Sequence, residues 1–256
     1  MRARAIATSI SRSTIFTLLI WVTTNLTGRT KNASDTSFPL EEGTYWVYQG
    51  FVRWWSFEVN QMSKTPVTWR MEVRKVIRRD HLLIAVVNGF PGDLDWSDGH
   101  PKPSHTLIIQ SEADKYYLIG SDEDVAAALE RVQDPNDLLE GLLQIDDLFL
   151  ELPLVQGKKF CDPEQMVRPD NHYCWVVDSA AHAASSAIKG VPPGQRIAYR
   201  VRFVTNPDDT AFSFVTGVGL TAYEYHHHGS VADTELKLVE FHPGDDGPAS
   251  SAPAHP

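Results

Sequence analysis

The sequence predicts a mainly β protein, an antiparallel curved sheet that forms a partly closed barrel or a sandwich, with a short helical insertion. Three observations predict this class. Apolar and polar residues alternate with a period of two along most of the chain, as in half-buried strands. Connections of hairpin length rich in Pro, Gly, Asn and Asp separate these runs, which number about ten. No run of strand type alternates with a crossover helix, so a doubly wound sheet is not expected.

A turn-and-strand box at residues 38–48 opens the expected domain. Pro39 fixes φ and cannot donate to a sheet, and Gly43 permits a tight turn. The residues that follow, Tyr45–Tyr48, favour a pleated and half-buried surface. A shorter second copy of the box, which we call the echo box, occupies residues 152–160. It has the same order of Leu or aromatic, Pro, Leu, Gly and aromatic residues. Two copies predict that the chain begins a fresh β layer twice.

The first β block is expected to end at Gly120. Ser63-Lys64-Thr65-Pro66 is expected to interrupt it, because Pro cannot donate to a ladder. The alternating or apolar runs of this block, each expected to form a strand, are residues 45–48, 51–57, 69–78, 82–87, 106–110 and 115–119.

A helical insertion is expected at residues 121–144. Ser121 is a favoured N-cap, and the acids that follow it suit the positive end of a helix. Asp134-Pro135 has the pattern of a cap followed by Pro at the first helical position, so a second short helix is expected up to Leu143.

The second β block follows the echo box. Residues 179–190 are rich in small side chains and are expected to form a loop or a weak helix. The expected strands are residues 174–177, 197–203, 211–216, 221–228 and 234–241. We therefore expect one β domain over residues 38–242 and, because Pro, Gly, Ala and Ser dominate beyond it, a disordered tail over 243–256.

The N-terminal residues indicate export. Arg2, Arg4 and Arg12 precede the short apolar run 15–22, and this layout is typical of a signal peptide, here residues 1–28. The apolar run is far shorter than the roughly 20 residues of a membrane-spanning helix, so no stable span is expected in the mature chain. Residues 29–37 are expected to be a linker. The expected location is periplasmic or extracellular, with an uncleaved N-terminal anchor as the alternative.

The chain contains two cysteines, Cys161 and Cys174. In an exported chain an even number of cysteines predicts a disulfide, here across a loop rich in Asp and Pro. Such a bridge would stabilise the protein by about 3 kcal/mol by restricting the unfolded chain. A metal site is the weaker alternative because no C-x-x-C pair is present.

Charge and missing motifs narrow the possible functions. The formal net charge of -10 argues against nucleic acid and anionic membrane surfaces as partners, since both require a basic face. The sequence contains no nucleophile elbow, phosphate loop or dinucleotide fingerprint. We therefore expect no catalytic residue and favour a protein that is not an enzyme.

Histidines near the C-terminus form one candidate site. On a strand, Glu224, His226 and His228 would share one face, and across a hairpin turn Asp233 or Glu235 could lie opposite them. Two imidazoles and carboxylates on one face could bind zinc or another divalent metal. The alternative is a polar hairpin tip in water.

Acidic residues in a Gly- and Pro-rich loop form a second candidate site. Asp93, Asp95 and Asp98 before Gly99 suggest a calcium loop, although the spacing is not that of an EF-hand. Asp93 and Asp95 could also be a carboxylate pair of the type used in glycoside hydrolysis. Turn formation by Asp and Gly explains the same residues.

Three boxes carry a resemblance to a family. Pro39-Leu40-Gly43-Trp46-Tyr48, Leu152-Pro153-Leu154-Gly157 and Gly217-Gly219-Leu220 resemble those of uncharacterised exported bacterial β proteins, many of them lipoproteins. The resemblance spans most of residues 38–241 and implies an envelope location and a curved sheet or half barrel. The chain departs from this family at Arg29, where a lipoprotein has its lipid-accepting Cys, and at Phe160, where a Trp is usual. The resemblance brings no activity and no catalytic residue.

Taken together, the residues predict a non-enzymatic envelope protein that binds or scaffolds an apolar ligand or a partner. Trp54 and Trp69 are the expected ligand-binding residues, on the inner side of a curved sheet that could enclose an apolar molecule. Burial in an ordinary core is the alternative for both. The competing function is a metal-binding protein or metal-dependent hydrolase that uses the hairpin of His226 and His228.

Overall fold

The structure is a computed structural model of the chain. It describes residues 38–79, 81–95, 101–112, 114–120, 122–137, 139, 141–184, 188–227 and 232–244. The expected signal peptide and linker, and the expected tail beyond Gly244, lie outside these residues.

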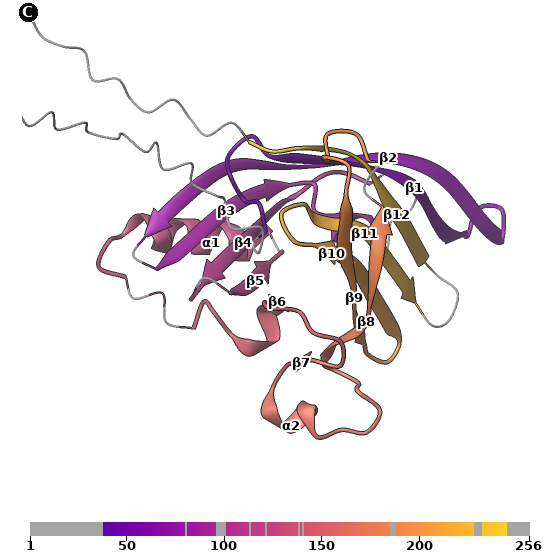
Figure 1. Cartoon of the computed structure of the whole chain (residues 1–256). Helices are drawn as coiled ribbons and strands as arrows, with labels where there is room; N and C mark the ends of the chain where they lie inside the picture. The colour runs from indigo at the N-terminus through magenta and orange to yellow at the C-terminus, as the bar shows by residue number, and fades with distance from the viewer. Residues whose placement is uncertain are drawn as a thin grey trace, which may run out of the picture. The chain divides into compact units, whose positions relative to one another are not determined.

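Within the described residues, twelve strands form one antiparallel sheet that is nearly closed, like a barrel with one seam (Figure 1). The sheet confirms the predicted fold class. The strands are β1 (Tyr45–Ser56), β2 (Gln61–Arg79), β3 (Leu82–Asn88), β4 (His105–Ser111), β5 (Lys115–Ile119), β6 (Leu148–Glu151), β7 (Lys159–Phe160), β8 (Trp175–Ala184), β9 (Gln195–Val204), β10 (Asp208–Val215), β11 (Gly219–His227) and β12 (Ala232–His242).

The chain builds the sheet as two meanders of neighbouring strands. The order is β6-β5-β4-β3-β2-β1-β12-β11-β10-β9-β8-β7, so the first six strands run outward from β1 and the last six return to pair with it. Strands β1 and β12 pair over most of their lengths. The end strands β6 and β7 are short, and Leu148 of one and Phe160 of the other line the same cavity at the seam.

The two sequence boxes begin the two meanders and have the same hydrogen bonds. Gly43 and Gly157 both adopt positive φ, 83° and 84°, in the turns that enter β1 and β7. Gly43 donates its N–H to the carbonyl of Val73, and Gly157 donates to that of Val177, at 3.0 and 2.8 Å. In each half the register of the next strand pair shifts just after that valine. Each box therefore begins one meander, as expected of a strand-entry device, but both meanders belong to one sheet and not to two layers.

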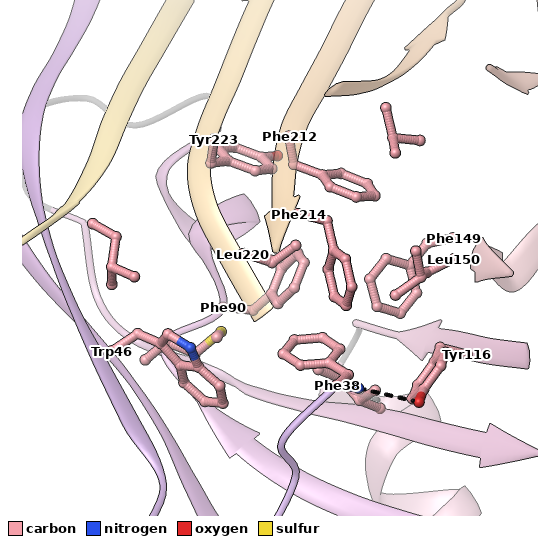
Figure 2. Close-up of a cluster of buried hydrophobic side chains, with 14 of the residues drawn as sticks. Phe38, Trp46, Phe90, Tyr116, Phe149, Leu150, Phe212, Phe214, Leu220 and Tyr223 are labelled. Carbon is pink, nitrogen blue, oxygen red and sulfur yellow. Dashed lines mark hydrogen bonds between the residues drawn. The ribbon is translucent and has the colours of Figure 1, made fainter. Parts of the chain in front are cut away.

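The inner face of the sheet holds the main core. Alternate residues of β1 point inward, and among them Trp46 and Tyr48 are fully buried. Phe38, from the box before β1, packs edge-on against Trp46 and Phe214, with ring centroids 5.7 and 5.6 Å apart (Figure 2). Aromatic rings from both meanders thus meet at the centre and join the two halves.

A second, smaller core lies on the outer face of β3 and β4, beneath helix α1 (Asp122–Gln133). Val125, Ala128 and Val132, spaced three and four residues apart, form the buried stripe of the helix. The helical insertion is therefore confirmed in its first half. The second helix expected from Asp134-Pro135 is wrong for the described residues, which form turns there. Leu139 takes a positive φ that ends any helix, and its side chain is buried in the outer core.

Three further short helical elements lie in connections. They are η1 (Pro91–Leu94), η2 (Ile145–Asp147) and α2 (Pro163–Met166), which Asp162 caps by accepting from the N–H of Glu164. None of the helices among the described residues is long and apolar enough to cross a membrane.

Several strands differ from the sequence expectation, among them β6, which was not expected. Pro66 lies inside β2, opposite Phe51, and does not interrupt it. Pairing of β2 with β3 begins only at Glu72, so the outer edge of β2 is free at Pro66, where a missing N–H costs no ladder bond. The small residues from Ser179 extend β8 up to Ala184, because the neighbouring β9 supplies their backbone partners.

The predicted disulfide is present. Cys161 follows β7 directly and Cys174 precedes β8, and the bond joins them with their Cα atoms 4.9 Å apart. It closes the loop that contains α2.

Candidate functional site

A cavity of about 340 Å³ lies inside the sheet, beside the packed core. Its walls come from the segment between β3 and β4, from β4 to β6, and from β8, β10 and β11. We call it the aromatic cavity; it is lined by Phe90, Gly92, Asp93, Asp95, Thr106, Leu118, Gly120, Phe149, Trp175, Thr210, Phe212 and Tyr223.

The segment 89–95 forms one wall and is held at both ends. Trp69 of β2 donates its indole N–H to the carbonyl of Gly89 at 2.8 Å. Thr234 of β12 donates its hydroxyl to the carbonyl of Leu94 at 3.2 Å. Leu94 is buried in the inner core, so the segment is anchored by packing as well as by hydrogen bonds.

Asp95 is the polar residue that this segment delivers to the cavity. Its Oδ2 accepts a hydrogen bond of 2.6 Å from the hydroxyl of Tyr223, which is 128 positions away in the sequence. Asp95 keeps some solvent exposure as a residue, but its Oδ1 is buried and accepts no hydrogen bond of good geometry. The hydroxyl of Thr234 is close enough to lower the pKa of Asp95, but it donates to the carbonyl of Leu94. A buried carboxyl oxygen without a partner is costly and therefore calls for an explanation.

The surroundings of Asp95 favour its neutral form. Burial raises the pKa of Asp95 well above the ordinary value, and the nearby carboxylates of Asp208 and Asp93 raise it further. The hydrogen bond from Tyr223 acts in the opposite direction. Burial also raises the pKa of Tyr223, so its hydroxyl stays protonated and is the donor of the bond.

Aromatic rings line the rest of the cavity. Phe90 stands edge-on to Phe149 and Tyr223, at centroid distances of 6.2 and 6.3 Å. Trp175 packs against Phe212 at 5.2 Å. Figure 2 shows Phe90, Phe149, Phe212 and Tyr223 among the side chains that fill the interior of the sheet. The cavity thus combines an apolar aromatic wall with one unsatisfied carboxyl group, a combination that suits an apolar molecule with one polar group.

Polar side chains from β10 and β11 form a network nearby. Asp208 accepts from the hydroxyl of Tyr225 at 2.7 Å, and its Oδ1 lies 2.8 Å from Nδ1 of His227. Burial and the hydrogen bond to Asp208 raise the pKa of Tyr225. The network places a second carboxylate close enough to act on Asp95.

Trp54 and Trp69 both lie on the inner face of the sheet, but not beside each other. In the register of β1 and β2, Trp54 faces Ser63 and Trp69 faces Tyr48. Trp69 is buried and supports the segment 89–95, whereas Trp54 is half-buried against the inner core. Neither lines the aromatic cavity. Ligand binding by these two residues stays a prediction.

The histidine hairpin has the expected alignment, as far as it is described. Glu224 lies opposite Glu235, and His226 lies opposite Asp233. Glu224 forms an ion pair with Arg200 at 2.8 Å, and Nδ1 of His226 lies 3.0 Å from Asp233, which also binds Arg53. His228 lies outside the described residues. Within the described part of the chain, no three His, Cys, Asp or Glu side chains are arranged to hold a metal ion.

The acidic loop separates its two described carboxylates. Asp93 accepts from the backbone N–H of Ser104 at 2.8 Å and from its hydroxyl, while Asp95 turns to Tyr223. Asp98 and Gly99 lie outside the described residues. The sequence drew attention to Asp95, but as part of a calcium loop or a carboxylate pair.

The aromatic residues that line the cavity with Asp95 were not predicted as site residues. Tyr223 and Phe212 are inward residues of alternating strands, a pattern shared by many core side chains. Alternation indicates that they point inward. It carries no signal for the empty space beside them, because that space depends on strands far apart in the sequence.

Comparisons with known proteins give a weak likeness. No protein-family model matches the chain, and no curated protein matches it. A solved structure from Bacteroides fragilis, described as "a putative exported protein with YmcC-like fold", is 10% identical, covers 81% of this chain and 99% of its own, and gives a TM-score of 0.36. Another, from Parabacteroides distasonis, described as "a putative lipoprotein", is 10% identical, covers 80% and 97%, and gives a TM-score of 0.31. Both descriptions agree with the family resemblance of the three boxes, but TM-scores this low support no statement about the location or ligand of this chain.

Proposed function

We propose that the protein is an extracytoplasmic, non-enzymatic binding protein that holds a small, mainly apolar molecule in the aromatic cavity. The observation that carries this proposal is a cavity of about 340 Å³ beside the packed inner core, lined by aromatic rings. Ligand sites in proteins typically enclose about 300–1,000 Å³ and combine apolar walls with a few polar groups. The volume is at the lower end of this range and favours a small ligand.

Export is supported by the cysteines and by the N-terminal sequence. Both cysteines of the chain are joined in one disulfide, and disulfides persist in oxidising compartments. The basic start and short apolar run of residues 1–28 have the layout of a signal peptide. A periplasmic or extracellular location is part of the proposal, with anchoring by an uncleaved N-terminal segment as its alternative.

An uncharged apolar dye tests the cavity. We expect N-phenyl-1-naphthylamine to bind saturably to the purified protein, with one site per chain, and its fluorescence to rise on transfer from water to an apolar site. The variant Gly120→Phe should weaken this binding by about tenfold or more, equivalent to about 1.4 kcal/mol. Gly120 lines the cavity, and a Cβ added to it would meet no atom within 4 Å, so a side chain can start there without a clash.

Gly194→Phe is the matched control. A Cβ added at Gly194 would also meet no atom within 4 Å, but this residue does not line the cavity, so dye binding should be unchanged. Equal affinities for the two variants, or no saturable binding to the wild type, would remove the proposal. Trp54→Phe in the same titration tests the predicted role of Trp54.

Metal binding at the histidine hairpin is the second candidate function. The observation that favours it is the cross-strand register, which places Glu224 opposite Glu235 and His226 on the same outer face. His228, two residues beyond His226, would share this face if the strand continued. With a divalent metal bound there, the chain would be a metal-binding protein, or a metal-dependent hydrolase with that metal as its cofactor.

Elemental analysis tests this second function. A metal site predicts about one equivalent of a divalent metal per purified chain, and a melting temperature that falls when a chelator removes it, because a bound metal stabilises the native state. His226→Ala should abolish both effects. Protein without stoichiometric metal, whose melting temperature is unchanged by chelator, would exclude the site.

A further inference from the structure

We propose that the ligand of the aromatic cavity is a small organic cation, with an ammonium group on an apolar body. The carboxylate of Asp95 forms an ion pair with this ammonium group. This inference rests on the proposed function and specifies its ligand class. Three features of the cavity carry it: an unsatisfied carboxyl oxygen, the sign of the neighbouring charges, and the aromatic faces.

The first feature is the oxygen. Oδ2 of Asp95 already accepts from Tyr223, whereas the buried Oδ1 has no partner. Buried polar atoms in native proteins are nearly always hydrogen-bonded, to protein, water or ligand. A ligand that donates a hydrogen bond would supply the missing partner, and an ammonium group has such donors.

The second feature is the local charge. Asp93 and Asp208 are the charged groups that act on Asp95, and both are negative. The main causes of the shift in its pKa include no Lys, Arg or His, and none of these residue types is among the described residues that line the cavity. In a site with a low dielectric constant this arrangement repels anions and attracts cations. A carboxylate-bearing ligand is therefore disfavoured.

The third feature is the wall. Five aromatic residues line the cavity together with Asp95: Phe90, Phe149, Trp175, Phe212 and Tyr223. The face of an aromatic ring carries negative electrostatic potential and attracts a cation, and the attraction is stronger when water is excluded. An ammonium group next to Asp95 would have aromatic rings around it, and its apolar body would replace water against the same rings.

The free protein and the complex differ in the charge of Asp95. Burial raises the pKa of Asp95, and Asp93 on its own segment, Asp208 of β10 and Tyr223 of β11 are the groups that face it. The hydroxyl of Thr234 on β12 lies close by and acts weakly in the opposite direction. A bound ammonium group favours the ionised carboxylate, so binding should release a proton and become tighter as the pH rises.

Three probes of similar shape test the ligand class. We measure how well 2-phenylethylammonium, 2-phenylethanol and 3-phenylpropanoate displace N-phenyl-1-naphthylamine, and we titrate each by calorimetry in two buffers that differ in ionisation enthalpy. We expect the ammonium probe to bind about tenfold or more tightly than the alcohol, a ratio equivalent to about 1.4 kcal/mol, and the carboxylate to bind worst. Only the ammonium probe should release a proton.

Asp95→Asn isolates the carboxyl group. This variant should lose the preference for the ammonium probe and its pH dependence, while its affinity for the alcohol stays within about twofold. Asp170→Asn, in the exposed disulfide loop, removes a carboxylate away from the cavity and should behave like the wild type. If Asp95→Asn fails to fold by circular dichroism, the comparison of probes and the pH dependence in the wild type still decide.

The outcomes separate the two proposals. Equal affinity for the ammonium and alcohol probes, or no displacement by any of the three although the dye binds, overturns the cation inference and leaves the binding function standing. Failure of the dye itself to bind overturns both.

Discussion

Replacing Trp46 by alanine is expected to lower the free energy of unfolding by about 3–5 kcal/mol, the range typical of large aromatic residues removed from a core. Trp46 is fully buried, and its indole N–H donates to the carbonyl of Val218 at 2.6 Å, across 172 positions of the sequence. Its ring also contacts Phe38 and Phe241. The variant would therefore leave a cavity and a buried carbonyl without its donor at the point where the two meanders meet.

Urea unfolding followed by circular dichroism measures this loss, and Trp55→Ala is the matched control. Trp55 is the same residue type nine positions along the same strand, but on the outer face and only half-buried. Its removal should cost about 1 kcal/mol or less, as for most partly exposed side chains. Similar losses for the two variants would contradict an inner core centred on Trp46.

Replacing Asp95 by asparagine is expected to stabilise the protein at neutral pH. Burial raises the pKa of Asp95 in the folded state above the value of about 3.9 that it has in an unfolded chain. Between these two values the folded state binds more protons than the unfolded state, so stability falls as the pH rises, and above the folded-state pKa the loss is complete. Asparagine has no such loss, because it does not titrate and can still accept from Tyr223.

The measurement is urea unfolding of wild type and Asp95→Asn between pH 4 and 8. The difference in stability between them should grow with pH, by about 1.4 kcal/mol for each unit that separates the folded and unfolded pKa values. Taking the difference cancels the carboxyl groups that titrate in both proteins. A difference that stays constant with pH would show that Asp95 ionises normally. A stabilised variant that also loses ligand preference would indicate that the carboxyl group is kept for binding at a cost in stability.

Local patterns were sufficient for much of the fold. The alternation of side chains predicted most strands of both blocks, although not β6, and the two boxes marked the starts of the two meanders at β1 and β7. Cys161 and Cys174 were paired correctly because the chain offers one pairing. These features depend on neighbouring residues, whose chemistry is visible in the sequence.

Other features depended on distant partners. Pro66 was expected to interrupt a strand, but β2 accommodates it because its outer edge has no neighbour there. Small residues after Ser179 have weak preferences of their own, and pairing with β9 makes them a strand. In both cases a neighbouring strand, or its absence, decides the outcome, and sequence patterns within one segment do not contain that information.

The candidate site shows the same division. Local residue patterns were enough to indicate a β domain with inward-facing aromatic residues, a disulfide and a loop that carries Asp95. The contact of that loop with Tyr223 and the aromatic cavity beside it arise from the folded sheet, because its curvature sets which inward side chains meet and where space remains. Inward direction is a local property of strand periodicity, whereas the charge, contacts and volume of a cavity come from all the strands together.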